Sequence, residues 1–202
     1  GRIDVAPPTA SPTWGFGDVL AAKLDASGTV SWLQHYGGLD EDIGHSIRRL
    51  SDGRVLIAGF TRSAKGNVSG WHGGSDAWLL QIAGDTGNLI TQKCLGGWND
   101  EAIFQLLPLA DGDFLLIGQT ESFNSDVSNN HGDSDIWLVQ LDGIFNLRWQ
   151  KCLGGKGSDA GHAVLDMADG TILLAGFGSP RGEGDIADGK TGTDLWVMKV
   201  KP

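Results

Sequence analysis

Apolar and polar positions alternate along most of the chain in short stretches, which is the pattern of β-strands with one buried face. Two stretches, 54–58 and 113–117, are almost continuously apolar, which indicates strands covered on both faces. No stretch of useful length shows the 3.6-residue period of an amphipathic helix. The pattern predicts an all-β protein built from short antiparallel strands.

The expected strands recur as a tandem repeat of 58 or 59 residues, seen as Gly37-Gly38, Gly96-Gly97 and Gly154-Gly155. After each glycine pair come a strand, an Asp-Gly turn, an apolar strand, a long polar loop, a strand centred on Trp, and a closing strand. Each unit therefore holds four antiparallel strands. A β-propeller with one blade per unit is the fold that this repeat predicts.

The repeat also divides the chain. We expect residues 1–17 to be an N-terminal extension and 18–202 to form the blades. Within the latter, 18–38 is a partial blade that supplies third and rim strands, 39–97 and 98–155 are whole blades, and 156–202 lacks its rim strand. A β-trefoil, also three repeats of four strands, is the alternative fold, but its shorter units leave the long loops unexplained.

The missing rim strand raises the question of closure. Strand 30–36 can supply it, which gives three blades within one chain or six between two chains. Open edge strands promote aggregation. We therefore expect either a homodimer that completes a six-bladed ring or a fragment of a longer propeller.

Charge and composition exclude some partners. The net charge of −10 argues against nucleic acid, because phosphates attract clustered Lys and Arg. No apolar run is long enough for a membrane-spanning helix. Cys94 and Cys152 occupy equivalent places in successive units, so we expect both thiols to stay free.

The order of motifs resembles a family. Gly-Gly, acidic residues, a His-Ser-Ile strand at 45–47, Asp-Gly, Ala-Gly-Phe-Thr at 58–61 and Asp-x-Trp-Leu are similar to bacterial, Bacteroidetes-type β-propeller repeats of secreted and surface proteins. The resemblance covers nearly the whole chain from Asp18. It implies first strands that line a central channel, and a location outside the cell, on its surface or in the periplasm. The third unit departs from the pattern, since Lys190 replaces the histidine of the other loops.

The long polar loops are candidate binding sites. Closely spaced acidic residues with glycines are suited to Ca²⁺, the one cofactor that we consider. The candidate ligands are Asp126, Asp133, Asp135, Asp185 and Asp188. The spacing is not that of an EF-hand, and the alternative is that these side chains cap turns.

Tryptophan positions separate into two groups. One group recurs at the same place in each unit and is expected to pack between blades: Trp78, Trp137 and Trp196. The other group lies in loops, where a ring can stack on a sugar or pack over the blades. With the loop histidines, these are the candidate ligand-binding residues: Trp14, Trp71, Trp98, His72 and His131.

Two histidines fall on the expected channel strands, each three residues after an aspartate. Asp42, His45, Asp159 and His162 are the catalytic candidates if the chain is a hydrolase or lyase, although histidines bonded to a neighbouring blade are the alternative. Motifs for a serine nucleophile, a zinc protease or a phosphate loop do not occur. The sequence favours a binding or scaffold module that recognises a carbohydrate or a protein partner through loops on one face. A spacer role on the cell surface is a third hypothesis.

Overall fold

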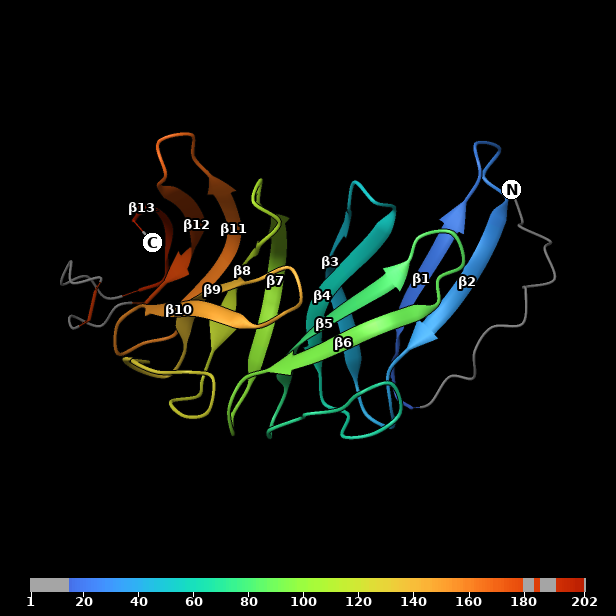
Figure 1. Ribbon diagram of the computed structural model, residues 1–202. Helices are drawn as coiled ribbons and strands as arrows, with labels where there is room; N and C mark the ends of the chain where they lie inside the picture. Colours follow the sequence, from blue (N-terminus) through green and yellow to red (C-terminus); the bar gives the residue numbers. More distant parts are fainter. Residues whose placement is uncertain (1–14, 180–183, 186–191, 202) are drawn as a thin grey trace.

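The protein is described from a computed structural model, which covers residues 15–179, 184–185 and 192–201. Thirteen strands and no helix occur in these residues, which confirms the all-β prediction. The strands form four open antiparallel sheets, and the described part of the chain contains no closed barrel. The sheets stand in a row, with the N-terminal and C-terminal sheets at opposite ends (Figure 1).

Strands that are consecutive in sequence are also neighbours in each sheet. The first sheet contains β1 (Val19–Leu24) and β2 (Val30–Tyr36). The second contains β3 (Asp42–Arg49), β4 (Arg54–Thr61), β5 (Asp76–Ala83) and β6 (Leu89–Leu95). The third contains β7 (Glu101–Pro108), β8 (Phe114–Thr120), β9 (Asp135–Leu141) and β10 (Leu147–Leu153). The last contains β11 (Ala160–Asp166), β12 (Ile172–Gly178) and β13 (Asp194–Val200).

Asp-Gly turns set the register between the first two strands of each of the last three sheets. In the second sheet, Gly53 has φ +91°, a left-handed conformation that costs glycine little. The preceding Asp52 accepts a 3.0 Å hydrogen bond at Oδ1 from the Arg54 amide. Asp111 and Asp169 accept the same bond in the next two sheets. These local contacts allow the hairpins to form from nearby residues alone.

The sheets pack face to face through three clusters of buried apolar side chains. Trp78 lies in the cluster between the first and second sheets, and Trp137 in the one between the second and third. Both are fully buried, which confirms the prediction that they pack in the core. Trp196 is only partly buried, because no strand of the described residues lies beyond β13.

Adjacent sheets are also joined at one edge by backbone hydrogen bonds. The amide of Glu101 on β7 donates to the carbonyl of Ser75 before β5, at 2.6 Å. The amide of Asp159 donates to Ser134 in the next junction, and that of Asp42 to Gly17 in the preceding one. These bonds hold the start of each first strand against the preceding sheet.

A β-bulge interrupts the first strand of the last three sheets opposite a glycine of the second strand. The register shifts leave His45, Phe104 and His162 as the extra residues. A Cβ at Gly118 would lie 1.8 Å from the carbonyl oxygen of Ala102. Only glycine permits this close approach, so the bulge and the glycine depend on each other.

Candidate functional site

The long loops and the Gly-Gly loops gather at one edge of the molecule. We call this the loop edge and define it as residues 37–41, 62–75, 96–100, 121–134 and 154–159. It follows from the antiparallel order, because every first and third strand begins there, and every second and fourth strand ends there. In Figure 1 the loop edge is the lower one.

A buried carboxylate holds each Gly-Gly loop in place. The amide of Gly38 donates to Oδ2 of Asp42 at 2.7 Å, and the hydroxyl of Ser63 donates to the same oxygen at 2.9 Å. Thr61 donates to Oδ1. Burial raises the pKa of Asp42, and these hydrogen bonds act in the opposite direction. Asp42 therefore ties the loop before β3 to the end of β4.

Glu101 and Asp159 do the same in the next two sheets. Glu101 accepts hydrogen bonds from the amide of Gly97 at 2.8 Å and from the hydroxyl of Thr120 at 2.7 Å. Asp159 accepts from the amides of Gly155 and Ser179, both at 2.8 Å. All of these carboxylates are fully buried. Their contacts indicate a structural role at the junctions between sheets.

The two histidines of the catalytic hypothesis make a different kind of contact. The rings of His45 and His162 lie on either side of Phe104, with centroids 5.2 and 4.6 Å from it. Phe60 and Phe177 extend the row beyond each histidine. Burial, and to a smaller extent the charge of His162, lowers the pKa of His45.

The structure thus brings His45 and His162 together through Phe104, on the neighbouring strands β3, β7 and β11. The carboxylates of Asp42 and Asp159 are bonded to loop amides and hydroxyls instead. The four catalytic candidates therefore do not share a hydrogen-bonded cluster. The bulges, which turn the rings out as extra residues, are the physical reason.

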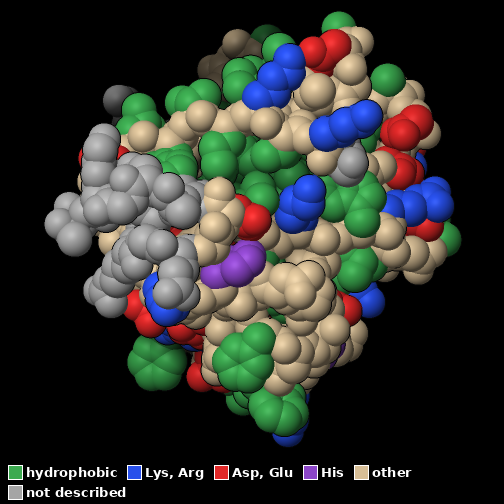
Figure 2. Space-filling view, turned by 90° about the vertical axis from the view of Figure 1, so that its left-hand side faces the viewer, with side chains coloured by type: hydrophobic (Ala, Val, Ile, Leu, Met, Phe, Trp, Pro, Cys, Tyr) green, Lys and Arg blue, Asp and Glu red, His purple; other side chains and the backbone are tan. Residues whose placement is uncertain are grey.

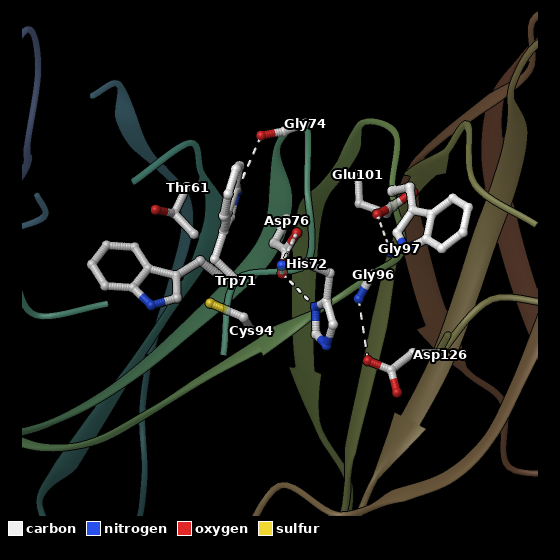
Figure 3. Close-up of polar contacts among 12 residues, drawn as sticks. Thr61, Trp71, His72, Gly74, Asp76, Cys94, Gly96, Gly97, Glu101 and Asp126 are labelled. Carbon is white, nitrogen blue, oxygen red and sulfur yellow. Dashed lines mark hydrogen bonds and ion pairs between the residues drawn. The ribbon is translucent and has the colours of Figure 1, made fainter. Parts of the chain in front are cut away.

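The loop histidines lie against the aspartates that begin the third strands. Nδ1 of His72 lies 2.7 Å from Oδ2 of Asp76, and Nδ1 of His131 lies 2.7 Å from Oδ2 of Asp135. Figure 3 shows His72 beside Asp76, with Trp71 on the same loop. Burial raises the pKa of Asp76 to about 6, although the contact with His72 lowers it. Each imidazole keeps about a third of its surface exposed, His72 at 32% and His131 at 31%.

The aspartates that the sequence suggested for calcium are dispersed among other contacts. Asp126 accepts a 3.2 Å hydrogen bond from the amide of Gly96 (Figure 3), and Asp185 lies 3.8 Å from Nε2 of His131. Asp133 is exposed, and Asp135 is buried with His131. Asp188 lies outside the described residues. Within the part of the chain that the structure describes, no group of three or more His, Cys, Asp or Glu side chains is placed to hold a metal.

Exposed aromatic rings are present on three adjoining loops, and we call Trp71, Trp98 and Phe123 the aromatic strip. Trp98 is 72% exposed and Phe123 is 71% exposed. The loops touch, because Asn124, next to Phe123, accepts a 3.1 Å hydrogen bond from the amide of Trp98.

On the other side of Trp98, a Cβ at Gly73 would lie 2.8 Å from the Trp98 carbonyl oxygen, so loop 62–75 packs against that backbone. The indole of Trp71 is anchored by a 3.1 Å bond to the Gly74 carbonyl (Figure 3). Hydrophobic side chains project at this lower edge in Figure 2.

The sequence identified two members of the strip but not Phe123. Phe123 could have been found from the repeat, because it replaces Ala64 at the same place in the next unit, in a mostly polar loop. Trp14 lies outside the described residues, so its expected role stays a prediction.

A hollow also lies between the first and second sheets, toward the edge opposite to the loop edge. Leu24, Trp32, Ile47 and Arg49 line it. It occurs where the two-stranded first sheet leaves part of the second sheet uncovered. The hollow contains none of the three side chains of the aromatic strip.

Comparisons with the models of known protein families and with curated proteins gave no match. In the described residues, no helix is long and apolar enough to cross a membrane.

Proposed function

We propose that this protein is a binding module that recognises a carbohydrate at its loop edge and acts outside a bacterial cell or at its surface. The observation that carries the proposal is Trp98, a large ring with 72% of its surface exposed on a loop whose backbone is held on both sides. With Trp71 and Phe123 on the adjoining loops, Trp98 gives the loop edge several exposed apolar side chains, and exposed apolar patches mark binding surfaces.

The chemistry around Trp98 suits a sugar. The C–H groups of a pyranose face pack on the flat face of an indole, and the hydroxyl groups need polar partners nearby. His72 and Asn99 are polar side chains of the same loop edge. The net charge of −10 favours a neutral or cationic ligand over an acidic polymer.

The arrangement of the sheets supports a propeller over a trefoil. The second and third sheets each have four antiparallel strands, and the sheets stack face to face with first strands side by side. In a propeller, this order places the loops of all blades on one face. A trefoil needs a closed barrel, for which the open sheets offer no support.

Closure of a ring needs strands in addition to those described. A homodimer that completes a six-bladed ring is one arrangement, and a longer array of blades is the other. Light scattering after size exclusion separates them, since the dimer has twice the mass of one chain. Addition of calcium in the same experiment tests whether the metal changes the assembly.

The binding proposal is tested with an array of glycans, followed by titration calorimetry of the best ligand. Trp98→Ala should lower the affinity at least tenfold, which is the effect expected for a stacking residue at the centre of a site. Ile144→Ala is the matched control, because Ile144 is also an exposed apolar residue but lies in the turn between β9 and β10.

Two results would contradict the proposal. One is an array on which no glycan binds. The other is full affinity in Trp98→Ala. Capture of a protein from the cell surface by the wild-type chain, lost in Trp98→Ala, would identify a protein as the partner of the same surface.

The hydrolase or lyase alternative receives no support from the contacts of its four residues. Asp42 and Asp159 are buried in loop junctions, and His45 and His162 stack on Phe104. A binding role remains the one that we propose.

A further inference from the structure

The third and fourth strands of the two complete sheets are joined by a pair of side chains. Nε1 of Trp78 on β5 donates a 2.8 Å hydrogen bond to Oε1 of Gln92 on β6. Nε1 of Trp137 on β9 donates a 2.9 Å bond to Oε1 of Gln150 on β10. Each tryptophan is fully buried, so the glutamine satisfies an indole N–H that water cannot reach.

The same glutamines continue the network into the loop edge. The amide nitrogen of Gln92 donates to the carbonyl and hydroxyl of Ser69, and that of Gln150 donates to those of Ser128. The glutamine side chain therefore fixes the fourth strand both to the third strand and to the long loop that precedes the third strand. A residue without a side-chain amide at this place would lose both the bond from the tryptophan and the bonds to the loop serine.

The first sheet shows that the two residues occur together. Leu20 of β1 stands two residues after Asp18, as Trp78 stands two residues after Asp76. Counted back from the Gly-Gly pair, Leu33 of β2 stands where Gln92 and Gln150 stand. A sheet without the tryptophan thus also lacks the glutamine, and two apolar side chains replace the polar pair.

The last sheet has the tryptophan without a partner. Nε1 of Trp196 on β13 is buried and has no hydrogen-bond partner in the described residues. In the second and third sheets, β6 and β10 pair with the outer edges of β5 and β9. The corresponding edge of β13 faces no strand in the described part of the chain. An edge of this kind presents unpaired amide and carbonyl groups to a further strand.

The face of β13 is open as well. Leu195 is 81% exposed and Val197 is 63% exposed, whereas the equivalent Ala77 and Leu79 on β5 are buried by β7 of the next sheet. Figure 2 views the molecule from this end and shows hydrophobic side chains on the surface between Lys and Arg side chains.

We propose that the free edge of β13 binds an extended strand of the β6 and β10 type, whose glutamine accepts a hydrogen bond from Nε1 of Trp196. The strand adds backbone hydrogen bonds to the edge. The indole N–H of Trp196 favours strands that carry a glutamine at the facing position. The sequence shared by β6 and β10 with their Gly-Gly pairs defines the partner: Leu-x-x-Gln-Lys-Cys-Leu-Gly-Gly.

Strand β2 does not meet this requirement, which weighs against the homodimeric ring that β2 would close. Leu33 would face Trp196 and leave its indole N–H buried without an acceptor, which costs stability. The inference is independent of the carbohydrate proposal, since it concerns the C-terminal end of the sheet row and no residue of the aromatic strip.

The test uses the intact chain and a synthetic peptide with the sequence of residues 147–155, under reducing conditions. We expect saturable binding by titration calorimetry and slower hydrogen exchange of the β13 amides. The peptide with Gln150→Leu should bind about tenfold more weakly, which is the loss of one buried hydrogen bond. A peptide with the sequence of residues 30–38 should also bind more weakly than the first.

A Trp196→Phe variant gives the control. Its lost donor should make the Gln and Leu peptides bind with equal affinity, while circular dichroism checks that it is folded. The indole N–H resonance of Trp196 in the wild-type chain gives a second measurement that needs no variant. It should shift with the Gln peptide and much less with the Leu peptide.

Three results would overturn the inference. They are no saturable binding, equal affinity of the two peptides for the wild-type chain, and an indole resonance that does not respond to the glutamine. The last result would indicate that Trp196 uses an acceptor of its own chain, such as Asp159, whose Oδ1 flanks Gly178 together with Nε1 of Trp196.

Discussion

Nδ1 of His72 lies 2.7 Å from Oδ2 of Asp76, although the carboxylate is fully buried and the imidazole is partly exposed. The backbone amide of His72 also donates to this carboxylate. The same pair occurs four residues apart in the next loop, as His131 and Asp135. Because the carboxylate is buried beside an imidazole, its protonation contributes a pH-dependent part to the stability of the fold.

Asp76→Asn should reduce the pH dependence of the free energy of unfolding. Burial raises the pKa of Asp76 from 3.8 to about 6, so the folded state binds the proton more tightly than the unfolded chain. Stability from this group is therefore full below about pH 4 and falls as the pH rises to about 6. A shift of roughly two units corresponds to about 3 kcal/mol at most.

Urea unfolding of both proteins between pH 4 and 7 measures the effect. Asp85→Asn, at an exposed turn, is the control and should keep the wild-type slope. Parallel curves for Asp76→Asn and the wild type would show that Asp76 titrates normally.

Gln92→Leu should destabilise the chain by about 1–2 kcal/mol, since it leaves the buried indole N–H of Trp78 without an acceptor. The same change in a Trp78→Phe background should cost less. A double-mutant cycle by denaturant unfolding isolates the pair, and a coupling energy near zero would mean that the bond contributes nothing.

Gly118→Ala should destabilise the protein by roughly 3 kcal/mol or more, because its Cβ would lie 1.8 Å from the Ala102 carbonyl oxygen at the bulge. Gly17→Ala is the matched control, with no atom within 4 Å of its added Cβ. Thermal unfolding of both variants checks the prediction. Similar melting temperatures would mean that the bulge relaxes at little cost.

Phe104→Ala should raise the pKa of His45 toward its ordinary value. The ring of Phe104 covers His45 at a centroid distance of 5.2 Å, and burial is the main cause of the lowered pKa. NMR titration of the His45 imidazole measures the change. Phe104→Leu, which keeps most of the cover, should move the pKa less, and an unchanged value in Phe104→Ala would identify another cause.

The positions of the two cysteines in the repeat were enough to predict that their thiols are free. Cys94 and Cys152 were expected to remain free because they fall at the same place in successive units. Both are free and buried, which confirms this expectation, and burial raises the pKa of each to about 12.

The His–Asp pairs show a signal that sequence reasoning overlooked. His72 and His131 each stand four residues before the aspartate of a third strand, a spacing visible in the chain itself. Asp135 was considered as a calcium ligand or turn cap, and Asp76 was given no role, whereas the structure places each histidine on its aspartate. The pairing is local, so the repeated spacing was enough to indicate it.

The sequence by itself determined the strands and their order, because alternation, Asp-Gly turns and glycine pairs act over a few residues. It placed strand 30–36 where β2 lies. It also identified Trp78 and Trp137 as core residues. These properties depend on local backbone preference and on burial of the nearest apolar side chains.

Only the tertiary structure decided where the polar side chains point. Asp42 meets Gly38 and Thr61 instead of His45, because a bulge turns His45 toward Phe104 of the next sheet. The unpartnered indole of Trp196 likewise follows from the edge on which it lies. Such contacts join residues that are distant in sequence, so their geometry is set by the packing of whole sheets.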